Sequence, residues 1–181
     1  MDVSTRLVTQ DDVPALVDLL RRNRDALAPY EPTRTDDYFT AHTQHDLVAD
    51  ALTRHTNGTM VPLVITADGD LAGRININDL VRGAFQSAHL GYWVAQCHQG
   101  RGVATAAVAD AARRAFNDLG LHRLQADTLV NNAASRAVLA HNGFIEIGRA
   151  SRYLRIAGRW QDCVLHQLLH EPASLDAAHT T

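Results

Sequence analysis

The sequence predicts an α/β (α+β) fold with a mixed, twisted central sheet flanked by helices. Short runs that are β-branched or alternate in polarity, which are typical of strands, lie between longer segments whose apolar residues recur at helical spacing. Glycine, proline and Asp-Gly signals separate these segments. Strands joined by tight turns must be antiparallel, whereas strands joined through a helix can be parallel, so we expect a mixed sheet.

The N-terminal third predicts one strand and two helices. Residues 3–9 are rich in β-branched side chains and favour a strand. Thr9 can cap the helix that follows, because apolar residues then recur three and four positions apart (Val13, Leu16, Val17 and Leu20). A proline-containing turn ends this helix, and Thr35 begins a second one over about residues 36–56.

The middle of the chain predicts a meander of three strands. Residues 59–67 and 71–80 flank Asp68-Gly69, a dipeptide typical of hairpin turns. Residues 87–96 form a third strand, which becomes more apolar toward its end.

The remaining segments alternate between helix and strand. They are a helix that ends near Leu119 before Gly120, a strand over 121–129, a helix over 133–142, and a hairpin of 144–156 and 160–169. The order is therefore β-α-α-β-β-β-α-β-α-β-β, in a single domain over residues 1–170. Residues 171–181 are polar, and we expect a disordered tail there.

Composition argues against several classes of protein. The 181 residues are 46% hydrophobic and 20% charged with a net charge of −3, and no basic block suggests nucleic-acid binding. The N-terminus has no secretory pattern, and no apolar run approaches the roughly 18 residues of a membrane span. We therefore expect a cytoplasmic protein that binds neither nucleic acid nor membrane. Cys97 and Cys163 should be free thiols, and the scattered histidines offer no metal-ligand pattern, so we expect no metal.

Residues 98–108, HQGRGVATAAV, place two glycines at the very start of an alanine-rich helix. The first turn of a helix has unpaired N–H groups and a partial positive charge, which together suit an anion. Gly100 and Gly102 permit close approach, Arg101 adds a cation, and Thr105 adds a hydroxyl. The fragment fits either a phosphate cradle or a plain strand-to-helix turn, and it has neither the P-loop nor the dinucleotide-binding pattern.

Residues 99–104, QGRGVA, match the pattern Q-x-x-G-x-A, and the wider sequence resembles the GNAT (GCN5-related) N-acetyltransferase superfamily, whose pyrophosphate loop carries this pattern. GYWVAQCHQGRGVATAAV, LGLHRLQA, NNAASRAVLAHNGFIEIGR and GRWQDCVLHQL follow one another as in its RimJ/RimL-type branch, the bacterial ribosomal-protein N-terminal acetyltransferases. The resemblance spans residues 87–169, and residues 1–86 match mainly in element order. It implies the GNAT fold, acetyl-CoA as cosubstrate, no metal, and a homodimer as a candidate assembly.

The resemblance also implies where acetyl-CoA binds, namely between two neighbouring parallel strands that here end near Ala95 and Thr128. The first strand usually carries a β-bulge, whose freed N–H groups bind pantetheine and polarise the thioester carbonyl. From the residues alone, Tyr92, Trp93 and Val94 also fit a buried core strand, and the two interpretations are compatible. The implied cofactor-binding residues are Trp93, Val94, Ala95, Gln99, Gly100, Arg101, Gly102, Val103, Ala104, Thr105, Asn131, Asn132 and Ser135.

Asn132 and Ser135 match the N-x-x-S that the family has at the start of a helix. Asn132 is also a good N-cap, and Ser135 either bonds local backbone or donates a proton to the departing CoA thiolate. The resemblance favours the second role for Ser135.

The general base is less well defined by the resemblance. Some relatives place a glutamate just before the tyrosine matched by Tyr153, whereas this chain has Arg152 there. Glu31, in the connection between the two early helices, is the candidate base, and Asp79 and His89 are further candidates from their positions.

The implied reaction is direct attack of a primary amine on acetyl-CoA, with a protein N-terminal α-amine as the expected acceptor. Two alternatives stay open. One is acetylation of a small amine, such as an antibiotic, a polyamine or an amino-acid derivative. The other is a non-catalytic acyl-CoA-binding module. The early helices and their connection mix arginines with acidic residues, so their charge does not choose among acceptors.

Overall fold

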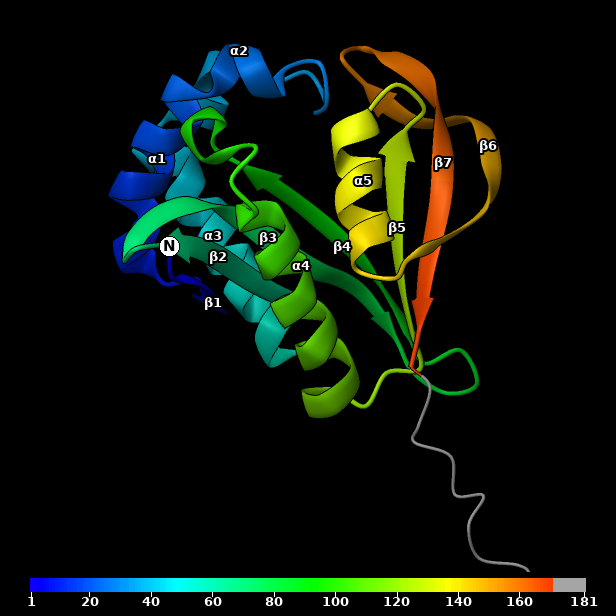
Figure 1. The fold of residues 1–181 in the computed structure, drawn as a ribbon. Helices are drawn as coiled ribbons and strands as arrows, with labels where there is room; N and C mark the ends of the chain where they lie inside the picture. Colours follow the sequence, from blue (N-terminus) through cyan, green and yellow to red (C-terminus); the bar gives the residue numbers. More distant parts are fainter. Residues whose placement is uncertain (171–181) are drawn as a thin grey trace, which may run out of the picture.

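The computed structural model describes residues 1–170, which fold around one seven-stranded sheet (Figure 1). Residues 171–181, where the sequence predicts a disordered tail, lie outside the described residues. The strands are β1 (Val3–Leu7), β2 (Val61–Ala67), β3 (Asp70–Val81), β4 (Ser87–Val94), β5 (Arg123–Leu129), β6 (Ile145–Ile156) and β7 (Arg159–Leu169). The helices are α1 (Val13–Arg22), α2 (Arg24–Leu27), α3 (Ala41–Thr56), α4 (Val103–Arg113) and α5 (Ala133–His141).

The sheet is mixed, as predicted. Its strands lie in the order β1-β2-β3-β4-β5-β7-β6, and every neighbouring pair is antiparallel except β4 and β5. Tight turns join β2 to β3 and β6 to β7, whereas α4 lies between β4 and β5 in the chain and allows them to run parallel. The predicted order of elements is therefore confirmed, except that the short helix α2 was not predicted.

Helices cover both faces of the sheet, and the alternation along β2 shows which helices cover which face. Leu63 and Ile65 belong to a buried cluster that includes residues of α4 and α5. Val64, between them, packs instead with residues of α1 and α3. Because successive side chains of a strand point to opposite faces, α4 and α5 cover one face and α1 and α3 the other (Figure 1).

The predicted helix over residues 36–56 is wrong at its start. Asp36–Phe39 form a 3₁₀ turn, and α3 begins only after it. Thr40 has extended backbone, and its side-chain oxygen accepts a hydrogen bond from the Thr43 N–H at 3.3 Å. Thr40, rather than Thr35, is therefore the N-cap of α3.

Two further boundaries differ from the sequence prediction. The chain continues from α4 as one π-helical turn, Arg114–Asp118, where the sequence predicts α-helix as far as Leu119. β4 ends at Val94 rather than at residue 96, and the chain then forms a 3₁₀ turn at Gln96–His98. Both differences are confined to element ends, where hydrogen-bond patterns change within one turn.

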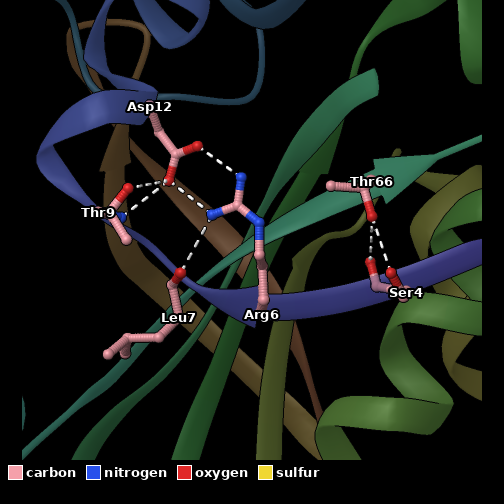
Figure 2. Close-up of polar contacts among 6 residues, drawn as sticks. All are labelled: Ser4, Arg6, Leu7, Thr9, Asp12 and Thr66. Carbon is pink, nitrogen blue, oxygen red and sulfur yellow. Dashed lines mark hydrogen bonds and ion pairs between the residues drawn. The ribbon is translucent and has the colours of Figure 1, made fainter. Parts of the chain in front are cut away.

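A carboxylate organises the turn that follows β1. Arg6 donates hydrogen bonds to both oxygens of Asp12, at 2.6 and 2.8 Å, and the Thr9 N–H donates to Asp12 at 2.8 Å (Figure 2). The hydrogen bonds from Arg6 hold the pKa of the Asp12 carboxyl below its usual value. Beside this network, the hydroxyls of Ser4 and Thr66 lie 2.8 Å apart and link β1 to β2 (Figure 2). Thr9 is thus the N-cap of a 3₁₀ turn, Gln10–Asp12, whereas Asp12 is the N-cap of α1, so the predicted cap lies one turn before the α-helix.

Candidate active site

β4 and β5 run parallel but pair over only a short stretch. Their paired residues are Ser87 with Arg123, Ala88 with Leu124, and His89 with Gln125. Beyond these pairs, β4 remains on β3 and β5 remains on β7, so the two strands diverge (Figure 1). We call residues 90–94 of β4 and 126–129 of β5 the open junction. Their facing edges carry backbone groups that are free to bind a ligand.

A cavity of about 350 Å³ lies at the open junction. Its walls come from β3, β4, β5, β6, the segment after α2, the Asp36–Phe39 turn, and α5. Residues that line it include Glu31, Arg74, Asn76, Gly91, Trp93, Asp127, Asn132 and Ser135. The cavity therefore brings together residues that the sequence analysis selected from three distant segments of the chain.

The backbone of β4 faces β3 and the open junction in alternation. The Ala95 N–H donates to the Ala72 carbonyl at 2.8 Å, so the backbone groups of Trp93, two residues earlier, also face β3. Val94 lies between them and turns its backbone groups toward the junction. Its carbonyl accepts a hydrogen bond from the Gln99 side chain at 3.3 Å. Of the three residues expected to bind through backbone, Val94 is the one whose N–H faces the junction.

The expected β-bulge at the end of β4 is wrong. The register with β3 is regular from His89 to Val94 of β4, and the irregularity lies between Asn78 and Val81 of β3. The strands approach closely where the bulge was expected, since a Cβ added to Gly73 would lie 2.2 Å from a carbonyl oxygen of β4. Divergence from β5 frees the edge of β4 without a bulge.

The loop before α4 has the backbone form that an anion site needs. Gly100 and Gly102 have positive φ angles of 69° and 80°, and Gly102 is the N-cap of α4. No side chain within residues 1–170 caps this end, so the first N–H groups of α4 are available to a ligand. Arg101 is exposed beside them, and Val103 is buried and offers its backbone only.

The other residues predicted to bind cofactor lie around this loop and the start of α5. Gln99 and Asn131 are exposed, and Ala104 and Thr105 are half-buried in the first turn of α4. The Thr105 carbonyl accepts from the Asn142 side chain at 3.3 Å, which ties α4 to α5. These residues do not line the cavity, and their roles in binding stay predictions.

Ser135 is held at the start of α5 by two polar contacts. The Asn132 side chain accepts from the Ser135 N–H at 3.1 Å and is the N-cap of α5, as predicted. The Tyr92 hydroxyl lies 2.8 Å from the Ser135 hydroxyl. Burial raises the pKa of Tyr92, and the hydrogen bond with Ser135 opposes this. Tyr92 is therefore protonated at neutral pH, and the two hydroxyls form a hydrogen-bonded pair facing the cavity.

Sequence reasoning missed the role of Tyr92, which it assigned to the core. The apparent core pattern was correct, because Tyr92 packs against the cluster beneath α4. Tyr92 nevertheless carries a hydroxyl, and a buried tyrosine hydroxyl usually finds a partner. The need for a hydrogen-bond partner was the signal in the sequence that could have identified Tyr92 as a site residue.

Glu31 enters the cavity from the segment after α2. Its carbonyl accepts from the Ala157 N–H at 2.9 Å, which fixes the segment to the β6–β7 turn. Its carboxylate lies 3.9 Å from the Arg34 guanidinium. Burial raises the pKa of Glu31, and the charges of Arg34 and Arg74 oppose this. The candidate base Glu31 is thus a carboxylate with two arginines, Arg34 and Arg74, close enough to affect its pKa.

Asp79 and His89 lie in a neighbouring cavity of about 440 Å³. His89 contacts Asp127, with 3.5 Å between Nδ1 and Oδ2, and Asp127 lines both cavities. The hydrogen bond to Asp127 raises the pKa of His89, against the effect of burial. Asp79 is paired with Arg54 at 3.4 Å and is well exposed. Neither Asp79 nor His89 lines the cavity at the open junction.

Arg152, where this sequence differs from some relatives, and Tyr153 lie at the edge of this second cavity. Tyr153 lines it, and Arg152 is exposed with a φ angle of 50°. The Arg152 N–H donates to the Asp162 carboxylate at 2.9 Å. The chain therefore supplies no carboxylate at residue 152, and the acidic groups facing the open junction come from Glu31 and Asp127.

Three further findings concern the described part of the chain. Cys97 and Cys163 are both free thiols, as predicted. Within residues 1–170, no three histidine, cysteine or acidic side chains are grouped so that they could hold a metal ion. No helix in that range has the length and apolar character needed to cross a membrane.

Comparison with known proteins gives a consistent set of relatives. Residues 3–145 match the acetyltransferase (GNAT) domain family. The chain is 32% identical over 165 residues to the [ribosomal protein uS5]-alanine N-acetyltransferase of Escherichia coli, covering 90% of this chain and 85% of that protein.

Solved structures show the same similarity. The Mycobacterium smegmatis RimJ structure in complex with CoA-disulfide has a TM-score of 0.90 and 35% identity, covering 92% of this chain and 81% of the other. The Vibrio fischeri ribosomal-protein-S5-alanine acetyltransferase has a TM-score of 0.88 and 28% identity, covering 93% of each chain.

Proposed function

Because the chain belongs to the GNAT acetyltransferase domain family, we propose that it transfers the acetyl group of acetyl-CoA to the N-terminal α-amine of a protein. Its activity as an acetyl-CoA-dependent N-acetyltransferase follows from its family and its relatives. The protein N-terminus as acceptor is the proposed part. The single observation that carries it is the cavity at the open junction, whose walls combine the predicted catalytic serine with carboxylates that suit a cationic amine.

The residues present fit acetyl-CoA. The Thr128 hydroxyl lines the cavity, is buried, and has no hydrogen-bond partner within residues 1–170, so a polar ligand would satisfy it. Gly100 and Gly102 leave the first N–H groups of α4 open to a pyrophosphate, with Arg101 beside them. The unpaired edge of β4 can take the amide-containing arm between these two points.

Acetyl-CoA supplies a thioester carbonyl, which a neutral amine can attack directly. In this proposal, the Val94 N–H, which faces the open junction, donates a hydrogen bond to that carbonyl oxygen and stabilises the negative charge that develops on it. A donor of this kind is worth about 3 kcal/mol. Both reactants bind between the divergent strands. The entropic cost of bringing them together therefore arises on binding and not in the chemical step.

In this proposal, Ser135 donates its proton to the departing thiolate. Tyr92 can then restore a proton to Ser135 across the 2.8 Å contact between their hydroxyls and regain its own proton from solvent when the product leaves. The proton of the attacking amine leaves toward a carboxylate of the cavity or toward water. Glu31 stays the proposed base of this step, since burial raises the pKa of its carboxyl toward the operating pH.

The test is CoA release from acetyl-CoA in the presence of peptides that begin with a free alanine or serine. The same peptides with an acetylated α-amine are the matched controls, and polyamines and aminoglycosides are the competing acceptors. Release that requires the free α-amine of a peptide supports the proposal. Release with a small amine alone, or acetyl-CoA binding without release on any acceptor, contradicts it.

A further inference from the structure

We propose that Asp127 and Asn76, on either side of Gly91, form the seat that receives the ammonium group of the acceptor. This inference rests on the proposed function, because it concerns the acceptor side of the same cavity. The three residues come from adjacent strands β5, β3 and β4, and all three line the cavity at the open junction. Nothing in the motifs of the sequence pointed to Asp127 or Asn76.

The three residues point to the face of the sheet opposite the proposed cofactor loop. Their neighbours along the strands, Ile75, Leu90 and Ala126, belong to the core beneath α4 and α5. Since side chains alternate along a strand, the residues next to these face the side of α1 and α3. An acceptor on that side approaches the thioester from across the sheet.

Asn76 offers a hydrogen-bond acceptor that has no use within the fold. Its Oδ1 atom is buried and has no hydrogen-bond partner among the described residues. A buried acceptor left unpaired destabilises the fold. An N–H donor from the acceptor would remove this cost, so the orphaned oxygen favours a ligand that donates.

Asp127 offers a carboxylate without an arginine partner. Its side chain is 14% exposed, and among residues 1–170 the basic side chain within ion-pair distance is His89, at 3.5 Å. Glu31, the other carboxylate of the cavity, is accompanied by Arg34 and Arg74. Of the two carboxylates, Asp127 is therefore the one that no arginine within residues 1–170 accompanies, and its basic neighbour His89 is charged only when it is protonated.

Gly91 leaves room between them. Asn76 lies directly opposite Gly91 in the β3–β4 register. A Cβ added to Gly91 would make only ordinary contact, at 3.5 Å from the Asn78 side chain, so nothing in the fold itself requires a glycine there. The absent side chain gives a small group access to the backbone of β4.

A primary ammonium matches this seat because it has only donors and carries a positive charge. Acetylation removes the charge and leaves a single N–H. The seat should therefore bind the free amine of the substrate more tightly than the acetylated amine of the product, so that the product leaves readily.

The experiment measures binding rather than turnover. An alanine-initiated hexapeptide and its Nα-acetylated form are titrated into the protein saturated with CoA. The wild type should prefer the free amine by about 30-fold, and Asp127→Asn should reduce this preference by about tenfold, because a buried charge pair loses one partner. Asp79→Asn removes a carboxylate from the neighbouring cavity and should keep the full preference. Equal preference in Asp127→Asn, or none in the wild type, overturns the seat.

Gly91→Ala is a second test of the seat, which still applies if Asp127→Asn does not fold. It should keep CoA affinity and melting temperature near the wild type while weakening the free-amine peptide by about tenfold, since a methyl group occupies the seat. Unchanged peptide affinity overturns the proposal. Turnover of the peptides, measured in parallel, separates the two proposals. If the wild type prefers the free amine but does not turn the peptide over, only the proposed function is contradicted. If the peptide is turned over and Asp127→Asn keeps the full preference, only the seat is contradicted.

Discussion

The edge of the sheet at β1 and the middle of the sheet at the open junction differ in how their polar groups are paired. Around β1, several polar groups pair with one another: Arg6 and Thr9 share the Asp12 carboxylate, and Ser4 pairs with Thr66 (Figure 2). At the open junction, Asn76 Oδ1 and Thr128 Oγ1 are buried without a partner within residues 1–170, and the edges of β4 and β5 face each other unpaired.

This difference predicts which substitutions should change stability and which should change binding or activity. A group whose hydrogen bonds are complete within the fold contributes to folding, whereas a buried group left unpaired costs stability and is explained by a ligand that satisfies it. Substitutions near β1 should therefore change the free energy of unfolding and leave the chemistry alone. Substitutions at the open junction and its loop should do the reverse.

The largest effect is expected at the loop. Gly102→Trp should weaken acetyl-CoA binding by about 10³-fold, because it blocks several N–H donors of α4 at once, each worth about 1.5–3 kcal/mol to a charged partner. Gly58→Trp is the matched control. Gly58 also has a positive φ angle and open surroundings, so it imposes the same strain at the end of α3. Calorimetric titration that finds normal affinity in Gly102→Trp would remove this loop from the cofactor site.

Gly73→Ala should give the next largest effect, on stability. The new Cβ would lie 2.2 Å from the Trp93 carbonyl oxygen, and the backbone there cannot move without breaking β3 from β4. We expect a loss of about 3 kcal/mol in the free energy of unfolding, measured by urea denaturation. Gly91→Ala, on the facing strand but with space around it, should lose less than about 0.5 kcal/mol. Equal losses in the two variants would contradict the assignment of close packing to Gly73.

The pair of hydroxyls gives an intermediate effect, on turnover. Ser135→Ala should lower kcat by about 100-fold with the KM for acetyl-CoA near the wild type, because the proton donor to the thiolate is lost. Tyr92→Phe should lower kcat by about tenfold, and the double variant should be no worse than Ser135→Ala alone, since Tyr92 acts through Ser135. Ser151→Ala, an exposed serine of β6, is the control. Additive losses in the double variant would mean that the two hydroxyls act separately.

The smallest effect is expected at Asp12. Its pKa is lowered in the folded protein by the hydrogen bonds from Arg6, so its stabilising effect is complete above the unfolded pKa and is lost as the pH falls through the folded pKa. Asp12→Asn should therefore cost about 1 kcal/mol at pH 7, a modest value because Arg6 is half-exposed. The difference from the wild type should begin to shrink at about pH 4 and should vanish only when the pH has fallen through the lowered pKa of the folded protein. Asp18→Asn removes an exposed partner of Arg22 and should cost almost nothing. A pH-independent loss in Asp12→Asn would contradict the role of its charge.

Patterns that are local in the sequence predicted most of the fold. Alternation, apolar spacing and the Asp68-Gly69 turn gave the order of elements, because each depends on neighbouring residues only. The boundary at Thr40 was missed because the sequence offers a capping residue at Thr35 as well, and the choice depends on how Phe39 is buried. Local pattern cannot decide between two competing caps.

The candidate site divides in the same way. The loop with Gly102 and the cap at Asn132 are local motifs, and both have the predicted backbone form. Tyr92, Asn76 and Asp127 were not found, because their significance lies in the divergence of β4 from β5. That divergence is a property of the assembled sheet, which no short stretch of sequence encodes.

Hydrogen exchange of the backbone amides, measured with and without acetyl-CoA, tests the open junction as the cofactor site most directly. Bound acetyl-CoA should slow exchange at Val94, over residues 100–105 and at the start of α5, and should leave β1 and β2 as they are in the free protein. Protection confined to other parts of the chain, or spread evenly over the sheet, would contradict the assignment of acetyl-CoA to the space between β4 and β5.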